Sequence, residues 1–217
     1  MMKTLALVSQ KGGAGKTTLA LHLALAAHQA GYQTAIVDLD PQASAWKWSQ
    51  RRKAPPEAVG ASPEQLESIK AKAQAGGLDI LILDSAPNAD RASLIACKAA
   101  DLVLIPCQAS ILDIDAIGAS YDLTEIARKP ACIVFNKCST LTDRDEIESR
   151  EGMKKRNVEV CPDILHDLVI FKRSLIVGRT ATEMEPISNA AKEVKSLFSW
   201  VEDRLDLHSK AMRRKAC

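Results

Sequence analysis

A run of glycines and lysines near the N-terminus has the composition of a phosphate-binding loop. It consists of Lys11, Gly12, Gly13, Ala14, Gly15, Lys16, Thr17 and Thr18. Glycines let successive backbone N–H groups curl around phosphate oxygens, because a Cβ would block both the dihedrals and the close approach. A strand-like stretch precedes the run and a helical stretch follows it, so the helix adds its unpaired N–H groups. We expect these residues to bind nucleotide phosphates.

Two side chains of the loop have roles that follow from the general phosphate-loop pattern. Lys16 is expected to reach the β- and γ-phosphates, and the Thr17 hydroxyl is expected to ligate Mg²⁺. The alternative is a glycine turn before a helix with no ligand. It requires seven specified positions to match by chance, which is about a one-in-a-million event in this chain.

Carboxylates follow two further strand-like stretches. Asp38 and Asp40 alternate along the chain and share a side of an extended segment, and Asp84 ends an apolar run. Open α/β sheets bind ligands at the carboxyl ends of their strands, and acids near a polyphosphate need Mg²⁺ or water between them. We therefore expect Asp84 to hold Mg²⁺ through water. The first two acids have an alternative role, which is to cap the turn before Pro41.

Strand-like and helical stretches alternate along the chain. The strand-like runs are continuously apolar, as in strands buried on both faces, and span 4–9, 34–38, 78–84, 101–106 and 131–136. Helical patterns span 16–30, 63–75, 89–99, 114–128, 143–156 and 186–205. This order predicts an α/β fold with a mostly parallel, twisted sheet flanked by helices on both faces. The proline-containing segment 51–60 is expected to be a flexible surface segment.

Composition places the chain among soluble globular proteins. Its 217 residues are 47% hydrophobic and 26% charged, which suits one domain over 1–207 followed by a basic tail over 208–217. A net charge of +2 does not by itself indicate a nucleic-acid or membrane partner. Six cysteines without a Cys-x-x-Cys pair and four unclustered histidines predict a reducing cytoplasm and no bound transition metal.

Lys11 gives the loop a resemblance to the ParA and MinD superfamily of P-loop NTPases. The deviant Walker A motif of that family is Lys-Gly-Gly-x-Gly-Lys-Thr, and ordinary phosphate loops do not specify the first lysine. In that family this lysine reaches the partner's nucleotide across a dimer interface. The resemblance therefore implies an ATP-bound homodimer in which Lys11 is catalytic, the alternative being a solvated surface lysine. The chain length is similar to that of the small ParF-like members.

The same resemblance implies roles for other polar residues. The segment 38–42 is similar to the family's switch I element, so Asp40 would position or deprotonate the attacking water and Asp38 would support the magnesium shell. The segment 85–87 resembles switch II, but its Ser-Ala-Pro departs from the usual Thr-Pro-Pro or Cys-Pro-Pro, which leaves the γ-phosphate sensors open. Asn136 aligns with an asparagine that contacts adenine, although an asparagine after a strand is often a turn former.

The resemblance implies a Mg-ATP-dependent switch for DNA partition, in this case of a plasmid. The ATP-bound dimer would bind nonspecific DNA, and an adaptor bound to a centromere-like site would stimulate hydrolysis and release the dimer. The protein would be cytoplasmic, and associated with the nucleoid when ATP is bound. Candidate DNA contacts are Lys172, Arg173, Lys195 and Arg204, unless they are solvated surface charges.

Two other readings stay open. A MinD-like membrane positioner, or another ParA-like positioner of a protein cargo, would share the loop. The end of the chain offers few bulky apolar residues for a membrane helix, so no stable membrane association is expected. A reductase like the nitrogenase iron protein would need two cluster cysteines per subunit, but Cys97 and Cys132 lie in apolar sequence without glycine-rich surroundings.

Overall fold

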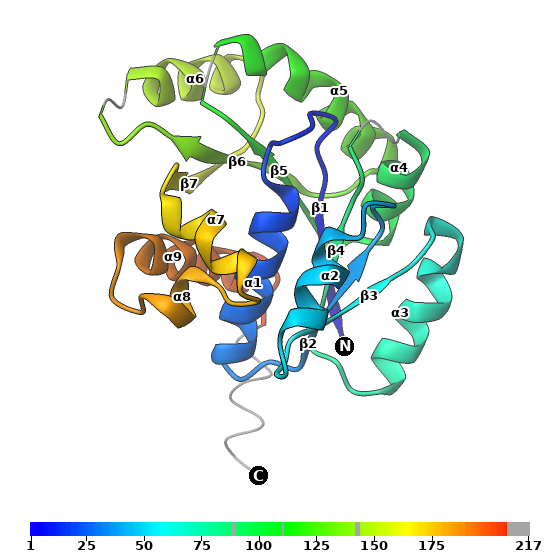
Figure 1. Ribbon diagram of the computed structural model, residues 1–217. Helices are drawn as coiled ribbons and strands as arrows, with labels where there is room; N and C mark the ends of the chain where they lie inside the picture. Colours follow the sequence, from blue (N-terminus) through cyan, green and yellow to red (C-terminus); the bar gives the residue numbers. More distant parts are fainter. Residues whose placement is uncertain (88–89, 110, 142–143, 208–217) are drawn as a thin grey trace.

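The centre of the molecule is a seven-stranded sheet in which every strand pair is parallel (Figure 1). The computed structural model describes residues 1–87, 90–109, 111–141 and 144–207. The strands are β1 (Lys3–Leu7), β2 (Thr34–Asp38), β3 (Glu57–Gly60), β4 (Ile80–Asp84), β5 (Leu102–Cys107), β6 (Ala131–Cys138) and β7 (Val160–His166). Their order across the sheet is β3-β2-β4-β1-β5-β6-β7. Because β1 lies between β4 and β5, the loop that follows it emerges at the middle of the sheet's carboxyl edge.

Helices cover both faces of this sheet (Figure 1). They are α1 (Lys16–Gln29), α2 (Ser44–Arg51), α3 (Leu66–Ala75) after the short 3₁₀ turn Pro63–Gln65, α4 (Asp90–Ala99), α5 (Ile111–Ala127), α6 (Arg144–Lys155), α7 (Val169–Ile176), α8 (Ala181–Met184) and α9 (Asn189–Arg204). The helices α1, α2, α7, α8 and α9 contribute to one hydrophobic core, and α3 to α6 contribute to the other. The predicted α/β fold with helices on both faces is confirmed.

The two cores follow from the alternation of side chains along each strand. On β1, Leu5 and Leu7 belong to the core beneath α1, whereas Ala6 belongs to the opposite core. On β4, Ile80 and Ile82 divide from Leu81 and Leu83 in the same way. A strand with both faces covered must be apolar at every position, which is why the central strands are continuous apolar runs.

Several elements were not predicted from the sequence. The helices α2, α7 and α8 are short, and β7 contains Pro162, Asp163 and His166. A proline in a strand is tolerated at the edge of a sheet, and β7 is the last strand in the order. The basic tail predicted at 208–217 lies outside the described residues.

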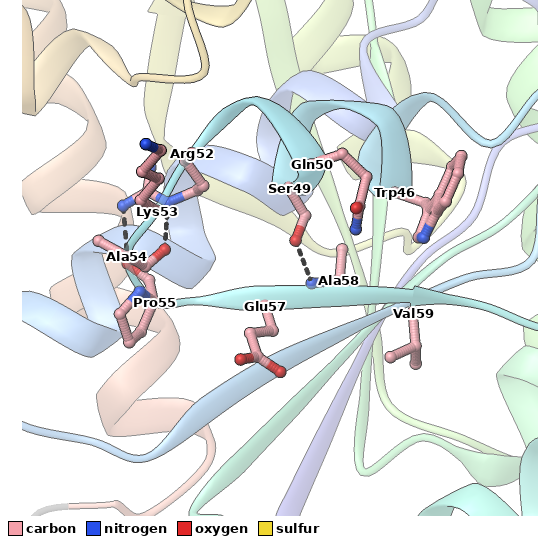
Figure 2. A pocket seen from close by; sticks show the side chains of 10 residues that line it. All are labelled: Trp46, Ser49, Gln50, Arg52, Lys53, Ala54, Pro55, Glu57, Ala58 and Val59. Carbon is pink, nitrogen blue, oxygen red and sulfur yellow. Dashed lines mark hydrogen bonds between the residues drawn. The ribbon is translucent and has the colours of Figure 1, made fainter.

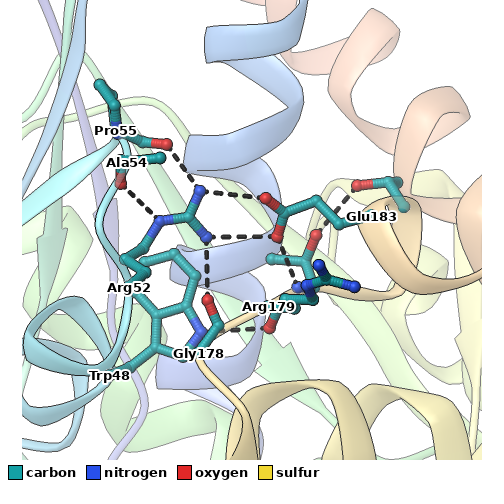
Figure 3. Close-up of polar contacts among 9 residues, drawn as sticks. Trp48, Arg52, Ala54, Pro55, Gly178, Arg179 and Glu183 are labelled. Carbon is teal, nitrogen blue, oxygen red and sulfur yellow. Dashed lines mark hydrogen bonds and ion pairs between the residues drawn. The ribbon is translucent and has the colours of Figure 1, made fainter.

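The segment 51–60 lies at the surface, as predicted, but it is bonded to the body and ends in β3, which the sequence did not indicate. Figure 3 shows the contacts of Arg52, whose side chain is 6% exposed. Its guanidinium donates to the carbonyls of Ala54, Pro55 and Gly178 and to both carboxylate oxygens of Glu183. Together these acceptors use the N–H donors of the guanidinium. Arg52 therefore links the end of α2 to Gly178 and Glu183.

Neighbouring contacts hold the same segment. The Trp48 ring lies under the Arg52 guanidinium, 4.5 Å from it, and its indole N–H donates to the carbonyl of Arg179. The Ser49 hydroxyl accepts from the Ala58 backbone N–H, which ties α2 to β3. Sequence patterns do not reveal the contact between Trp48 and Arg179, because these residues lie far apart in the chain.

A buried histidine ties α1 to the start of α8. His22 Nδ1 lies 2.8 Å from the carbonyl oxygen of Thr18, and Nε2 accepts the backbone N–H of Ala181 at 3.1 Å. These partners require a neutral ring with its proton on Nδ1. Burial lowers the pKa of His22 to about 4, and protonation would also place an Nε2–H against the N–H of Ala181.

This histidine predicts a loss of stability in acid. The unfolded chain binds the proton near the ordinary histidine pKa of about 6.5, whereas the folded protein resists it down to about 4. Stability therefore falls as the pH falls through this window, by roughly 3 kcal/mol from this group. Urea unfolding of the His22→Gln variant between pH 7 and pH 4 should show a flatter decline than the unmodified protein shows. His28→Gln, in the last turn of the same helix, is the matched control and should keep the original slope.

Candidate functional site

The glycine-rich loop joins β1 to α1 at the carboxyl edge of the sheet. Gly13 and Gly15 have φ values of 76° and 100°, in the left-handed region that a side chain disfavours. A Cβ on Gly15 would lie 2.0 Å from Nδ2 of Asn136. The loop therefore needs glycine at this position for both dihedral and steric reasons, as the sequence indicated.

A cavity of about 260 Å³ opens over this loop. Its lining residues are Gly13, Gly15, Lys16, Thr17, Thr18, Asp40, Pro87, Lys137 and Lys172. The structure thus brings predicted phosphate-loop residues together with Asp40, the predicted catalytic acid. It adds Lys137 and Lys172, to which the sequence analysis assigned no role at the nucleotide.

Lys16 is the buried cation of the loop. Lys16 is the first residue of α1 and is 6% exposed. Its Nζ donates to the carbonyl of Ser9 at 2.9 Å. Burial lowers the pKa of Lys16, while the carboxylates of Asp84 and Asp40 favour its charged form. The ammonium is therefore already held at the loop, where it can neutralise a polyphosphate.

Asp84 is the least satisfied acid of the site. It is 0% exposed, and among the described residues neither of its carboxylate oxygens has a hydrogen-bond partner. Desolvation raises the pKa of Asp84 to about 7, and the Thr17 hydroxyl is near enough to oppose this rise without a well-formed hydrogen bond. A buried carboxylate without partners is costly unless a cation neutralises it. Together with the hydroxyl of Thr17, it provides the hard oxygen ligands that fit Mg²⁺.

Asp38 has a different set of contacts. Its Oδ1 accepts the N–H of Asp40 at 3.1 Å, and its Oδ2 accepts the N–H of Trp46 at 3.0 Å. Burial raises the pKa of Asp38, and these backbone donors oppose the rise. The side chain thus caps the start of α2, as the turn-capping alternative proposed. A supporting role in the magnesium shell stays a prediction.

Asp40 is partly exposed and lies beside the cavity. Its Oδ1 accepts the backbone N–H of Gln42 at 2.8 Å, which fixes the turn at the carboxyl end of β2. In the described part of the chain, Asp38, Asp40 and Asp84 do not form a three-acid metal cluster. A metal there would take its other ligands from phosphate and water.

Asn136 and Lys137 brace the loop from β6. The Asn136 amide is 4% exposed and donates from Nδ2 to the carbonyl of Ala14 at 2.8 Å, and Lys137 Nζ donates to the carbonyl of Gly13. These contacts hold the loop in the shape that its N–H groups need. The adenine contact of Asn136 stays a prediction. Lys137 directly follows Asn136, and only its position after a strand could have drawn attention to it.

The four predicted DNA contacts occupy two helices. Lys172 and Arg173 lie on α7, and Lys195 and Arg204 lie on α9 about 14 Å apart along the helix. Arg204 pairs with Glu159 and has its guanidinium 5.3 Å from the centre of the Trp200 ring. The four residues therefore do not form one compact patch within a single chain.

Other parts of the structure bear on the alternatives. Lys11 is exposed on the glycine-rich loop. Cys97 and Cys132 are 0% and 1% exposed and lie in different hydrophobic cores. Among the described residues, no helix is long and apolar enough to cross a membrane.

A larger cavity of about 480 Å³ lies between α2 and β3 (Figure 2). Trp46, Gln50, Lys53 and Glu57 are among its lining residues. Arg52 also lines it, but the donors of this guanidinium are used by protein acceptors. Neither the glycine-rich loop nor Lys16 lines this larger cavity, so the smaller cavity is the candidate phosphate site.

Comparisons with known proteins agree with this assignment. A family model described as the CobQ/CobB/MinD/ParA nucleotide binding domain matches residues 5–195. "Maintenance of carboxysome distribution protein A" of Gloeobacter kilaueensis is 37% identical over 212 residues, which cover 94% of each chain. The chromosome-partitioning ATPase Soj of Thermus thermophilus is 30% identical over 58% of this chain and 63% of its own. The Mg-ADP complex of septum site-determining protein MinD from Pyrococcus horikoshii shares the fold, with a TM-score of 0.78, 17% identity and coverage of 93% and 96% of the two chains.

Replacing the unpartnered acid Asp84 by a neutral residue should stabilise the metal-free fold and weaken metal binding. Asp84→Asn removes a buried charge. At pH 8 and without metal, the free energy of unfolding of the variant should therefore be roughly 2–4 kcal/mol higher than that of the unmodified protein. Addition of MgCl₂ with nucleotide should raise the melting temperature of the unmodified protein and leave that of the variant almost unchanged. A variant that is less stable without metal would contradict this account of Asp84.

Proposed function

The chain belongs to the CobQ/CobB/MinD/ParA nucleotide-binding family, and from this premise we propose that it is a Mg²⁺-dependent ATPase that works as a positioning switch. The observation that carries the proposal is the cavity over the glycine-rich loop, whose lining residues Lys16 and Thr17 lie close to the buried, unpartnered carboxylate of Asp84. This combination suits a nucleotide polyphosphate with its metal and few other ligands.

Hydrolysis in this site requires positioning and charge neutralisation more than covalent chemistry. The loop N–H groups and Lys16 bind the phosphates, while Thr17 and Asp84 hold the metal. Bound Mg²⁺ neutralises charge on the phosphate oxygens. Asp40 orients the attacking water and accepts its proton, because it is the partly exposed carboxylate at the cavity wall.

ATP drives formation of a homodimer in this proposal. The exposure of Lys11 contrasts with the burial of Lys16, although both belong to the same loop. An exposed lysine on this loop is accessible to a second chain, and the family resemblance gives it the partner's nucleotide. The dimer then forms only while nucleotide is bound.

DNA is the surface on which the switch operates, and a centromere-binding adaptor stimulates hydrolysis and releases the dimer. Partition relatives such as Soj support a DNA cargo, which we take to be a plasmid. Arg173 and Lys195 are exposed on neighbouring helices, and a dimer doubles each weak phosphate contact. The ATP-bound form would then be associated with the nucleoid, with no stable attachment to a membrane.

A protein assembly is the second candidate cargo. Two relatives called "Maintenance of carboxysome distribution protein A" match 94% and 91% of this chain, at 37% and 30% identity. Both cargo types use the same ATP switch, so they differ in the adaptor. A pull-down with the ATP-bound chain distinguishes them by whether the captured adaptor binds a DNA repeat array or a protein particle.

The role of Lys11 predicts a separation of binding from dimerisation. Lys11→Ala should keep ATP affinity within about threefold, since the monomer's own phosphate contacts remain, but should stay monomeric with Mg-ATP in light scattering. Lys16→Ala is the control that should lose ATP binding itself. Dimers of Lys11→Ala at saturating ATP would remove the cross-subunit role.

DNA retention is expected to depend on nucleotide and salt. The ATP-bound protein should retain DNA of any sequence at low salt, and ADP or higher salt should release it. The double variant Arg173→Ala, Lys195→Ala should weaken retention without changing ATP affinity. Arg204→Ala is the matched control and should lose less, because Glu159 already neutralises that charge. Retention that is equal with ATP, with ADP and without nucleotide would refute the switch.

A further inference from the structure

Lys172 is held beside the phosphate cavity by the packing of α7 on α1. α7 buries Ile170 and Phe171, and the edge of the Phe171 ring meets the His22 ring with 5.1 Å between centroids. His22 lies one helical turn after Thr18, whose carbonyl accepts its Nδ1 proton. Lys172 follows Phe171 on α7, and it lines the same cavity as Thr18.

The ammonium of Lys172 has a weak partner. Its Nζ lies 3.0 Å from Oδ1 of Asp167, and the two side chains are 65% and 51% exposed. An ion pair this exposed contributes little to stability, because water solvates both charges well. Asp167 itself is anchored, since its backbone N–H donates to the carbonyl of Cys138. Lys172 can thus leave Asp167 for a stronger acceptor without disturbing the fold.

A phosphate chain is such an acceptor. Asp40 lines the same cavity and Asp84 lies beside Lys16, so the site holds acids that disfavour a polyphosphate. Lys137, the other exposed lysine of the lining, already donates to the carbonyl of Gly13. A further cation that can turn toward the cavity offsets this repulsion, and a phosphate oxygen binds an ammonium more strongly than a solvated carboxylate does.

We propose that Lys172 is a phosphate-binding residue of the nucleotide site and that Asp167 competes with the nucleotide for it. This inference rests on the proposed ATPase function and deepens it. Lys172 is exchanged between two anions: it pairs with Asp167 before the nucleotide binds and with the phosphate chain afterwards. From the sequence, Lys172 and Arg173 were both expected on a DNA-binding surface. Of the two, only Lys172 lines the nucleotide cavity.

Calorimetric titration of the full chain with Mg-ATP tests the exchange, because its two partners should respond with opposite signs. Lys172→Ala should weaken ATP binding about tenfold, and Lys172→Arg should restore most of it. Asp167→Asn should tighten ATP binding about threefold, because it releases the lysine. Arg173→Ala, at the next position of α7 but outside the cavity lining, should leave the ATP affinity unchanged. Thermal unfolding of each variant reports whether α7 still packs.

Three results would overturn the inference. The first is an unchanged ATP affinity in Lys172→Ala. The second is weaker binding in both Lys172→Ala and Asp167→Asn, which would make the pair a structural support of α7. The third is a normal ATP affinity with lost DNA retention, which would assign Lys172 to the DNA surface. Failure of the unmodified chain to bind ATP would instead refute the proposed function, and Lys16→Ala would then match it.

Discussion

An unpaired carboxylate buried at the end of the central strand β4 is the constraint on which the rest of the site depends. Asp84 has no exposed surface and no hydrogen-bond partner in the described part of the chain, so its charge is costly without a cation. The nearby cation, Lys16, is itself partly desolvated and has a lowered pKa. The apolar sheet around Asp84 raises this cost, because burial desolvates the carboxylate. A metal ion would neutralise the carboxylate of Asp84 and a polyphosphate would neutralise the ammonium of Lys16, so this arrangement favours binding of both.

The glycine-rich loop gains its shape from distant parts of the chain. Asn136 and Lys137, at the end of β6, donate to the carbonyls of Ala14 and Gly13. These two carbonyl groups are thereby turned toward β6, which leaves the loop's N–H groups for a ligand. A parallel sheet makes this possible, because the carboxyl ends of β1, β4 and β6 all open at one edge.

Helix α2 is held at both of its ends by charged side chains. Asp38, at the end of β2, accepts the Trp46 N–H at the start of the helix. Arg52, just after the helix, binds Glu183 and the carbonyl of Gly178. The segment before α8 therefore rests on α2, and through Ala181 it also rests on His22 of α1. The segment 178–183 thus links α2 to α1.

The sequence by itself determined the α/β fold, the glycine-rich loop and the acids at the strand ends, because these depend on local patterns. Apolar runs mark strands buried on both faces, and glycine spacing marks a loop of unusual dihedrals. It did not reveal β7 or the packed segment 51–60, whose residues are polar and contain proline. Only the tertiary structure decided that Asp38 caps a helix, that Asp84 is unpartnered and that Lys172 faces the nucleotide cavity. The physical reason is that burial and pairing depend on which segments pack together in space. Lys172 lies more than a hundred residues from the glycine-rich loop, and no local pattern encodes their proximity.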